Sequence, residues 1–581
     1  MENQELIKQV TEKAEKWLTP AYDAETQAEV KRMLENPDKT ELIDSFYKDL
    51  EFGTGGLRGI MGAGTNRMNI YTVGAATQGL SNYLNKCFAG KKDISVVVGY
   101  DCRNNSDKFA KISADIFSAN GIKVYLFEDL RPTPEMSYTI RKLGCQSGII
   151  LTASHNPKEY NGYKAYWDDG AQMIAPHDKN TIAEVNKIRN ASEIKFKGNK
   201  ELIEIIGKEI DDAYMAELKK LVLHQECIDK YGKELKIVYT PLHGTGNIPA
   251  RRILRELGFE NVYVVPEQEL PDGDFPTVSY PNPEAAEAFE LALALAKQHD
   301  ADLVLATDPD ADRLGVYVKD KDGEYHCLTG NMSGSLLAEY ELSQIKATKG
   351  LPKDGALIKS IVTTNLVNEM AKSYGVKLVE VLTGFKFIGQ KMLEFETKHN
   401  GTYLFGFEES YGCLIGTHAR DKDAIVATMA LCEAAAYYRS QGKTLWDAMI
   451  DIYEKYGYHV DAIHTLTLKG IEGLEKIKSI MDQLKSHTPK EIAGLEVLWA
   501  RNYDNDTATN MKNKAVVPTG LPKSNVVYYE LEGGAWLCVR PSGTEPKIKF
   551  YYGVIGKDFD DAQKKSEEFG EAVNKMIEYM M

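Results

Sequence analysis

The sequence predicts an α/β protein with three similar αβ domains, each built on a mixed, mostly parallel sheet, followed by a smaller C-terminal α+β domain. The first observation is a pattern of three short apolar runs, each ending in a polar or glycine-rich loop, which occurs three times along the chain. The second is the helical length of the segments between the runs, which is typical of βαβ units. The third is chain length, because 581 residues at roughly 150 per domain indicate more than one core.

The first stretch of the chain, residues 1–45, is expected to be a helical extension. Leu6 and Val10 lie on one face of a helix, and Pro20 ends that segment before a second helix begins near Glu25. The apolar runs begin only after this stretch, so it lies outside the repeated pattern.

The three passes of the pattern define three expected domains, residues 46–220, 221–328 and 329–460. In each pass the third run is followed by an unusual polar loop. These third runs are residues 148–151, 303–306 and 403–405. Ligands of parallel sheets bind at the carboxyl ends of the strands. We therefore expect a functional site in the loops that follow these three runs.

The last stretch, residues 461–581, has a different pattern. Helical segments alternate there with apolar strands such as 525–529 and 536–539. This pattern predicts the smaller α+β domain.

The bulk composition argues against two classes of partner. A net charge of −15 argues against nucleic acid, which requires clustered positive charge, but not against a local site for an anionic substrate. The sequence has no run of about 18 apolar residues and no secretory signal after Met1, so we expect no membrane contact and a cytoplasmic location. The eight cysteines form no Cys-x-x-Cys pair, so we expect reduced thiols and no zinc site.

The first polar loop, Thr152-Ala153-Ser154-His155-Asn156-Pro157, contains a candidate nucleophile. A serine in a tight turn at the end of a strand is exposed to a substrate. Lys164 follows ten residues later and is a candidate cation or acid beside it. On spacing alone, an ordinary surface turn is the simpler interpretation of this loop.

The second loop, residues 307–313, carries Asp308, Asp310 and Asp312 at alternate positions. Carboxylates in this arrangement converge on one hard cation, and oxygen ligands favour Mg²⁺ or Ca²⁺ over zinc. An EF-hand is excluded because Arg313 and Lys319 stand where that loop requires glycine and glutamate. A solvated acidic turn is the alternative, and it is disfavoured because the crowded carboxylates repel one another.

The third loop, residues 407–412, contains Glu408 and Ser410 at the end of a strand. A carboxylate and a hydroxyl in this place are suited to sugar hydroxyls. A helix N-terminus with acidic residues in its first turn explains the loop equally well.

A fourth loop follows an apolar strand near the C-terminus and contains Arg540, Ser542, Gly543 and Thr544. Arginine, hydroxyls and the backbone N–H groups that glycine exposes form a phosphate cradle. We expect this loop to bind a phosphate group.

The glycine-rich segment 53–59 is a further candidate anion site. Its glycines allow the backbone to approach an anion closely, and Arg58 adds positive charge.

Together the loops resemble those of the α-D-phosphohexomutase family, which includes phosphoglucomutases and phosphomannomutases. Residues 152–157 look like its phosphoserine loop, 308–313 its metal loop, 408–410 its sugar loop and 540–544 its phosphate loop. The motifs come in the order of the family and span most of the chain.

The resemblance implies three αβ domains of shared topology and a fourth domain that closes over a central cleft. It implies that phosphorylated Ser154 and the three aspartates, Asp308, Asp310 and Asp312, hold Mg²⁺. The residues expected around the reacting oxygens are Ser154, Lys164, Arg58, His155 and Lys422. Those expected to bind the substrate are Glu408, Ser410, Lys386, Arg313, Thr383, Gly384, Arg540, Ser542, Gly543 and Thr544.

The activity that the resemblance implies is an isomerisation of a small-molecule phosphosugar. We expect interconversion of glucose 1-phosphate and glucose 6-phosphate, with glucose 1,6-bisphosphate as intermediate and activator. Glucose is favoured because the residues that correspond to Glu408 and Ser410 face sugar hydroxyls in the glucomutases that this chain resembles. We expect the enzyme to be a monomer or a weak dimer.

Several alternatives use the same residues. Phe407 stands where the family usually has glycine, so a mutase of mannose or pentose phosphates stays open. A synthase that makes a sugar bisphosphate from a separate phosphoryl donor is a further alternative within the same fold. A phosphatase with its nucleophile in Asp308-x-Asp310 leaves the Ser154 and Arg540 loops unexplained. A phosphosugar-binding regulator built on an inactive enzyme is disfavoured because Ser154 and the aspartates are intact.

Overall fold

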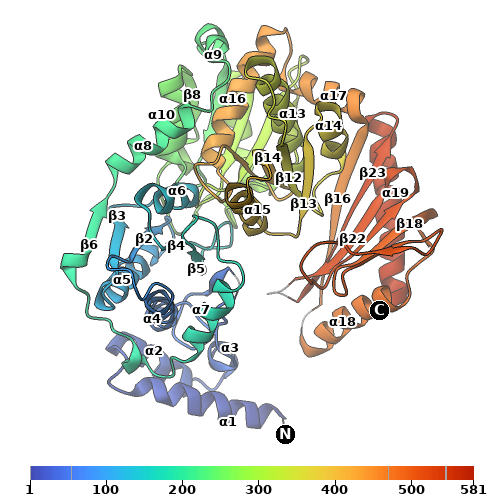
Figure 1. Ribbon diagram of the computed structural model, residues 1–581. Coiled ribbons are helices and arrows are strands. Elements are labelled where there is room, and N and C mark those ends of the chain that lie inside the picture. Colours follow the sequence, from blue (N-terminus) through green and yellow to red (C-terminus); the bar gives the residue numbers. More distant parts are fainter. Residues whose placement is uncertain (1, 54, 469, 543–545) are drawn as a thin grey trace. The chain divides into compact units, whose positions relative to one another are not determined.

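The structure is a computed structural model that describes residues 2–53, 55–468, 470–542 and 546–581 (Figure 1). The chain divides into two compact units. The first unit comprises Met1–Thr329, Phe385–Gly406 and Ser410–Leu445, and the second comprises Gly330–Gly384, Phe407–Glu409 and Trp446–Met581.

The first unit begins with helices that pack around an aromatic cluster. These are α1 (Glu2–Glu15), the 3₁₀ turn η1 (Lys16–Leu18), α2 (Ala24–Glu35) and α3 (Thr40–Phe46). The Trp17 ring stacks on Tyr22 and meets Phe46 edge to face. The Asp23 side chain accepts a hydrogen bond from Thr26 N and so begins α2, close to the predicted start at Glu25.

The first sheet of this unit has the order β1-β5-β4-β2-β3-β6. Its strands are β1 (Gly56–Ile60), β2 (Ser95–Tyr100), β3 (Lys123–Phe127), β4 (Ser147–Leu151), β5 (Tyr160–Tyr166) and β6 (Ile203–Ile206). Strands β4, β2, β3 and β6 run parallel, β5 pairs with β4 in antiparallel fashion, and β1 at the edge pairs with β5 in antiparallel fashion. The helices of this region are α4 (Ile70–Cys87), α5 (Ser106–Ala119), α6 (Thr133–Leu143), α7 (His177–Asn186), α8 (Lys208–Lys219) and α9 (Gln225–Tyr231). Helices α5 and α6 pack on β2 and β4 (Figure 1).

The second sheet has the order β11-β10-β9-β7-β8. Its strands are β7 (Lys236–Thr240), β8 (Asn261–Val264), β9 (Leu303–Thr307), β10 (Leu314–Lys319) and β11 (Tyr325–Leu328). Parallel strands β9, β7 and β8 are continued by antiparallel β10 and β11. The associated helices are α10 (Asn247–Leu257), α11 (Pro266–Glu269) and α12 (Glu290–His299), and α12 packs on β7 and β9.

The third pass of the sequence pattern contributes elements to both units. The first unit contains α15 (Phe385–Lys398), β15 (Gly412–Ile415) and α16 (Ala424–Ser440). The second unit contains α13 (Gly330–Thr348), β12 (Gly355–Ser360), α14 (Leu366–Tyr374) and β13 (Lys377–Val381), and β12 and β13 pair in parallel. Strand β14 (Thr402–Glu408) ends at the predicted sugar loop.

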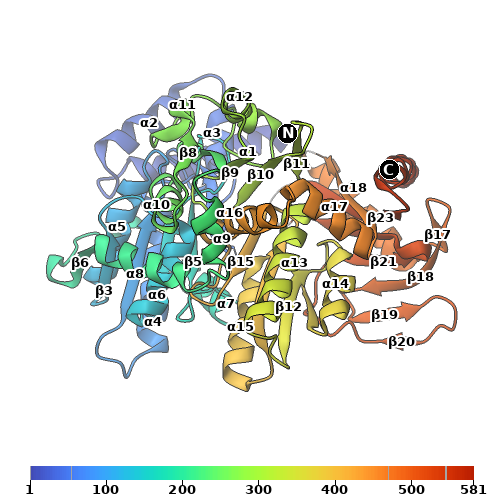
Figure 2. The same ribbon diagram turned by 90° about the horizontal axis from the view of Figure 1, so that it is seen from above.

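The C-terminal part of the second unit is an antiparallel sheet with helices on it. Its strand order is β16-β23-β22-β21-β18-β19-β20, and β17 pairs with β18. The strands are β16 (Tyr458–Thr467), β17 (Glu491–Ile492), β18 (Leu495–Asn502), β19 (Thr507–Asn510), β20 (Val516–Val517), β21 (Val527–Leu531), β22 (Trp536–Pro541) and β23 (Lys547–Gly556). Strands β18, β19 and β20 lie side by side at one end of this sheet (Figure 2). The helices are α17 (Leu445–Tyr456), α18 (Gly470–Ser486) and α19 (Phe559–Met580).

The predicted fold class is confirmed. Mixed sheets with parallel central strands precede a C-terminal domain of antiparallel strands and helices. The eight cysteines all lie within the described residues and form no disulfide bond. Among the helices that the structure describes, none has both the length and the apolar character that crossing a membrane requires.

Candidate functional site

The Ser154 loop follows β4 directly and holds the serine in an unusual backbone conformation. Ser154 has φ of 54°, in the left-handed region that residues with a Cβ rarely adopt. Its side chain is buried, and its Oγ donates a hydrogen bond of 3.0 Å to Asp308 Oδ2. His155 Nδ1 lies 3.3 Å from the same Oγ. The candidate nucleophile and the candidate metal loop are therefore in direct contact within the first unit.

The aspartate loop after β9 brings three buried carboxylates together. Oxygens of Asp308, Asp310 and Asp312 lie within 4.8 Å of one another. Asp310 Oδ1 and Asp312 Oδ1 are buried and have no hydrogen-bond partner among the described residues. Burial and the neighbouring carboxylates raise the pKa of Asp308 well above its ordinary value. A hard divalent cation would satisfy these oxygens and reduce the repulsion, so the residues present fit Mg²⁺.

Two lysines balance part of this negative charge. Lys164 on β5 donates a hydrogen bond of 2.8 Å from Nζ to Asp310 Oδ2, and its Nζ lies 3.4 Å from Asp312 Oδ2. Burial favours the neutral form of Lys164, but the two aspartates outweigh that effect and raise its pKa. Lys422 Nζ lies 3.6 Å from Asp312 Oδ2. Burial alone would raise the pKa of Asp312, but Lys164 and Lys422 outweigh it and lower that pKa.

The Lys422 side chain passes close to Gly412 before it approaches Asp312. A Cβ at Gly412, the first residue of β15, would lie 2.0 Å from Lys422 Cδ. Helix α16 begins directly after this lysine because the Asp423 carboxylate accepts hydrogen bonds from Ile425 N and Val426 N. The helix start and the glycine together determine the course of the Lys422 side chain.

Two arginines add positive charge beside the Ser154 loop. Exposed Arg58 on β1 donates a hydrogen bond of 3.2 Å from Nη1 to Asn156 Oδ1. Arg313, at the end of the aspartate loop, donates one of 3.2 Å to Glu284 Oε1. Burial, with a smaller contribution from the charges of these arginines, holds the pKa of His155 well below its ordinary value. The His155 imidazole is therefore neutral near pH 7.

The remaining candidates of the first unit are Lys386 and Ser410. Burial lowers the pKa of Lys386 on α15, and the nearby Asp178 offsets this only in part. The Lys386 Nζ lies 5.2 Å from the centre of the Phe387 ring. Ser410 is half-buried.

In the second unit, Glu408 supports the turn that contains Thr383 and Gly384. Its Oε1 accepts a hydrogen bond of 2.8 Å from Gly384 N. Thr383 Oγ1 is buried and has no hydrogen-bond partner in the described part of the chain. The neighbouring Glu409 differs, because its Oε2 accepts hydrogen bonds from the hydroxyls of Ser360 and Thr363. Glu409 is thus held by the end of β12, while Thr383 retains an unused hydroxyl.

Phe407 occupies a core position. Its side chain is fully buried, and it packs so closely on α13 that a Cβ at Gly334 would lie 2.1 Å from its ring. Phe407 therefore fills the interior of the second unit behind the sugar loop. Phe407 stands where the family usually has glycine, and the absence of a side chain at Gly334 on α13 leaves room for its ring.

Arg540 lies on β22, before the turn to β23. Its Nη1 donates a hydrogen bond of 3.2 Å to the Tyr551 hydroxyl. Ser542 N donates a backbone hydrogen bond of 2.8 Å to Lys547 O, the first residue of β23. Two predicted members of the phosphate loop, Gly543 and Thr544, lie outside the described residues.

Several residues that were not predicted from the sequence contact the candidate loops. Thr133, at the start of α6, donates a hydrogen bond of 2.6 Å from Oγ1 to Asp310 Oδ2, and its N–H donates to Asp310 O at 2.9 Å. The Tyr166 hydroxyl donates one of 2.5 Å to Asp421 Oδ2, beside Lys422. Arg103 contacts the Ser154 loop through its guanidinium group. Only the Pro-Thr-Pro start of α6 was visible in the sequence as a local signal.

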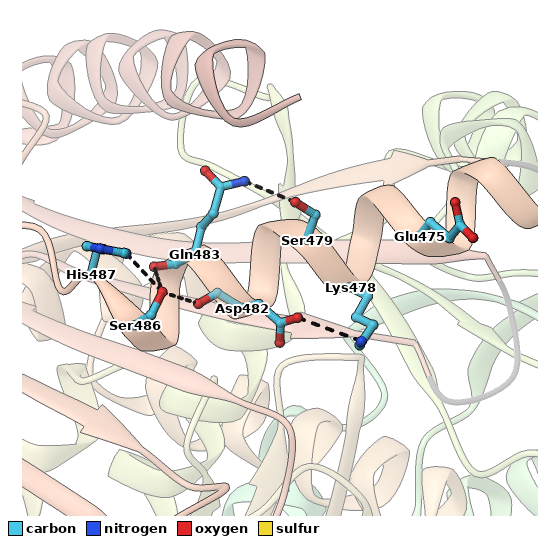
Figure 3. Close-up of a pocket in the computed structure, with 7 residues that line it drawn as sticks. All are labelled: Glu475, Lys478, Ser479, Asp482, Gln483, Ser486 and His487. Atoms are coloured by element: carbon cyan, nitrogen blue, oxygen red, sulfur yellow. Dashed lines mark hydrogen bonds and ion pairs between the residues drawn. The ribbon is translucent and has the colours of Figure 1, made fainter.

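Two further features lie apart from these loops in the sequence. A pocket along α18, shown in Figure 3, contains none of the candidate residues, and its polar side chains bond to one another. The residues that line it are Glu475, Lys478, Ser479, Asp482, Gln483, Ser486 and His487.

A group of His224, Glu226 and Cys227 also has the composition of a metal site. In that group the imidazole Nδ1 lies 2.5 Å from the Glu226 carboxylate, which already pairs the two side chains.

A family comparison matches most of the chain. The family described as phosphoglucomutase/phosphomannomutase, alpha/beta/alpha domain I, matches residues 49–192. Its domains II and III match residues 212–323 and 329–456.

Several curated proteins are similar over nearly the full length. A phosphoglucomutase of Staphylococcus epidermidis is 37% identical over 540 residues, which cover 92% of this chain and 96% of the relative. A phosphoglucomutase of Staphylococcus aureus is 36% identical over 554 residues, which cover 95% of this chain and 97% of the relative.

Solved structures with similar folds include two whose names contain the word phosphoglucomutase. Parafusin from Paramecium, named as a phosphoglucomutase and captured in an open form, superimposes with a TM-score of 0.68 at 19% identity, covering 92% of this chain and 96% of that one. A phosphoglucomutase/phosphomannomutase family protein from Burkholderia thailandensis gives 0.62 at 17% identity, covering 89% and 96%. At these identities the two structures support the fold alone.

Proposed function

Because the chain belongs to the phosphoglucomutase/phosphomannomutase family, we propose that it interconverts glucose 1-phosphate and glucose 6-phosphate with Ser154 as phosphoryl carrier. The protein is a phosphosugar mutase, an isomerase. The observation that carries the proposal for Ser154 is its hydrogen bond of 3.0 Å to Asp308, inside a trio of buried carboxylates. A nucleophile beside a candidate metal site is the arrangement that phosphoryl transfer requires.

In the proposed reaction, the free hydroxyl of a glucose monophosphate attacks the phosphorus on phosphorylated Ser154. The bond from phosphorus to Ser154 Oγ breaks and its electron pair stays on Oγ, which gains a proton as the sugar hydroxyl loses one. The products are glucose 1,6-bisphosphate and unphosphorylated Ser154. The bisphosphate then turns around, and Ser154 takes up the other phosphoryl group. The isomeric monophosphate leaves, and the serine is again phosphorylated. Added glucose 1,6-bisphosphate acts as activator because it phosphorylates enzyme that has lost its phosphate.

Neutralisation of charge is the proposed task of the residues around Ser154. A phosphoserine carries a charge of about −1.5 to −2, and the transferring group spreads charge over its oxygens. Lys164 stays protonated because the aspartates raise its pKa, so we assign it as a fixed cation rather than a base. Mg²⁺ held by Asp308, Asp310, Asp312 and an oxygen of the phosphoserine would supply further positive charge at the transferring group.

The substrate-holding residues are proposed to divide into two groups. Glu408 and Ser410 would bind sugar hydroxyls, and the unused hydroxyl of Thr383 is available for the same purpose. Arg540 and Ser542 would hold the phosphate that does not react.

The sugar preference is tested with a panel of glucose, mannose, glucosamine and ribose 1-phosphates, each with its bisphosphate as activator. We expect glucose 1-phosphate to have the highest kcat/KM. Moving one hydroxyl from equatorial to axial breaks one or two hydrogen bonds, so we expect discrimination of about 10- to 150-fold against mannose. A ribose 1-phosphate preference of more than about tenfold would contradict the assignment to glucose. Stoichiometric release of inorganic phosphate would instead indicate a phosphatase.

Replacing Arg540 by alanine tests the phosphate anchor. We expect KM for glucose 1-phosphate to rise about 10- to 100-fold with a smaller fall in kcat, because a charge-assisted contact to phosphate is lost outside the reacting centre. Steady-state kinetics of the variant measure both constants. The matched control is Arg501→Ala, since Arg501 on β18 also lies in the second unit and pairs with Glu530. An unchanged KM in Arg540→Ala would exclude this arginine as the anchor.

A further inference from the structure

The main chain of Ser154 is held from both sides by one buried network. Its carbonyl oxygen accepts a hydrogen bond of 2.7 Å from Arg103 Nη2. Its N–H donates one of 2.9 Å to Thr152 Oγ1, and the Thr152 hydroxyl donates one of 2.6 Å to Asp101 Oδ2. Arg103 Nε lies 3.4 Å from the same Asp101 oxygen, which closes the network. An ion pair therefore supports both polar groups of the Ser154 backbone.

The Arg103 guanidinium binds the Ser154 loop at several points. Besides Ser154 O, it donates to Asn156 O at 2.6 Å, Pro157 O at 2.9 Å and Tyr160 O at 3.1 Å. These carbonyls cover the whole turn from β4 to β5. The side chains of Arg103 and Asp101 are both fully buried, so water does not compete for these bonds.

The topology explains why this pair lies under the serine. Asp101 follows β2 directly, Ser154 follows β4 closely, and β2 and β4 are adjacent parallel strands. The Asp101 N–H donates a hydrogen bond of 3.1 Å to Leu151 O, the last residue of β4. The Arg103 guanidinium also lies over the ring of Phe275, whose centre is 5.1 Å from Arg103 Cζ.

The Nη groups of Arg103 donate to backbone carbonyls, and its buried Nε forms an ion pair with Asp101 without a hydrogen bond, so Arg103 does not act on the substrate itself. We propose that Arg103 is a positioning residue that locks Ser154 in its left-handed backbone conformation and so aims Oγ at the transferring phosphoryl group. This inference rests on the proposed role of Ser154 as phosphoryl carrier. The left-handed conformation is strained for a serine, so it persists only where surrounding contacts enforce it.

Loss of this lock is expected to affect the chemical step more than binding. A displacement of about 1 Å in a reacting group can lower a rate about 100-fold. Lysine keeps the positive charge but has one nitrogen in place of the planar fork, so it cannot reach the four carbonyls together. We therefore expect Arg103→Lys to lower kcat at least about 100-fold and to change KM for glucose 1-phosphate less than about threefold.

The experiment compares Arg103→Lys with Arg252→Lys, a control that shortens an ion-paired arginine on α10, where Arg252 contacts Asp212 and Glu256. Both proteins are assayed below their unfolding temperatures, with circular dichroism to verify folding. Phosphate on Ser154 is measured by intact mass and peptide mapping after incubation with glucose 1,6-bisphosphate. A second readout is the fate of the phosphoryl group on Ser154. It is the ratio of transfer to glucose 1-phosphate over hydrolysis by water. We expect a larger share to reach water in Arg103→Lys and an unchanged share in the control.

Thr152→Val provides a second variant that leaves the ion pair in place. It removes the hydroxyl that accepts the Ser154 N–H, so kcat and the partition are expected to change in the same direction as in Arg103→Lys. It keeps the test decisive if Arg103→Lys does not fold. The inference would be overturned if a folded Arg103→Lys variant had near-wild-type kcat and a near-wild-type phosphate partition. If Arg103→Lys does not fold, the same result in Thr152→Val would overturn it. Wild-type enzyme that turns over without phosphate on Ser154 would overturn the carrier role and this inference with it.

Discussion

Replacing Ser154 by alanine is expected to lower kcat for glucose 1-phosphate at least ~10³-fold, because the covalent route has no substitute. The Ser154 side chain is buried, and its Oγ donates a hydrogen bond to Asp308, a member of the carboxylate trio. Thr133 Oγ1 does contact Asp310, but its hydrogen bond of 2.6 Å and its place at the start of α6 hold it as a support. The loss should therefore appear in kcat, with binding of the sugar phosphate largely retained.

The measurement combines steady-state kinetics with intact mass after incubation with glucose 1,6-bisphosphate. Wild-type protein should gain about 80 Da on the Ser154 peptide, and Ser154→Ala should gain none. Ser113→Ala is the matched control, because Ser113 is also buried in the first unit, where its hydroxyl donates to Phe109 O within α5 and accepts from Thr77 Oγ1. Turnover by Ser154→Ala within tenfold of wild type would show that another group carries the phosphate.

The fold and the centre of the candidate site could be predicted because their signals are local in the sequence. Short apolar runs with helical spacers predicted the strands, and β4, β9 and β14 end where the polar loops begin. Ser154 and Asp308 each follow a parallel strand, β4 and β9, at a carboxyl end where ligand-binding loops are expected, and the side chains of the two sheets' loops meet. The regular spacing of the aspartates was sufficient to predict that their oxygens converge.

The supporting contacts could not be predicted because they join residues far apart in the chain. Thr133 contacts Asp310 from the start of α6, 177 residues earlier in the chain. Arg103 bonds to carbonyls more than fifty residues later, and a backbone carbonyl has no side-chain signature in the sequence. The contact of 3.3 Å between Ser154 Oγ and His155 Nδ1 occurs at a serine in the left-handed backbone conformation, which the sequence of the loop does not reveal.

Phe407 illustrates a different limit. Its bulk indicated a changed sugar pocket when only the neighbouring sequence was considered. The ring instead packs over Gly334 in the core, a compensation located on α13, seventy residues before the sugar loop. Whether a large residue faces a ligand or the interior depends on its partner across the fold, and the sequence of one loop does not contain that partner.

Replacing Asp310 by asparagine is expected to lower kcat about 10²- to 10³-fold at a Mg²⁺ concentration that saturates the wild type, with partial recovery at higher metal concentration. Asparagine retains the shape of the side chain but removes the charge that a hard cation binds. A metal ion contributes several kcal/mol to the stabilisation of charge in the transition state, and each 1.36 kcal/mol corresponds to a factor of ten. Asp310 is informative because its Oδ1 is buried without a partner while its Oδ2 is held by Lys164 and Thr133.

Metal binding is measured apart from activity by the electron paramagnetic resonance signal of Mn²⁺, which reports free metal. We expect Asp310→Asn to raise the Kd for Mn²⁺ at least about tenfold, since one of the three anionic ligands is lost. Asp504→Asn is the matched control, because exposed Asp504 pairs only with Lys485 in the described structure.

The Asp310→Asn variant also separates two roles of Asp310. If asparagine weakened turnover but left Mn²⁺ affinity intact, Asp310 would act by holding the Lys164 ammonium, whose pKa it raises, and the cation would have to bind elsewhere. Parallel loss of Mn²⁺ affinity and turnover, with recovery at high metal concentration, is the result that the orphaned Oδ1 predicts.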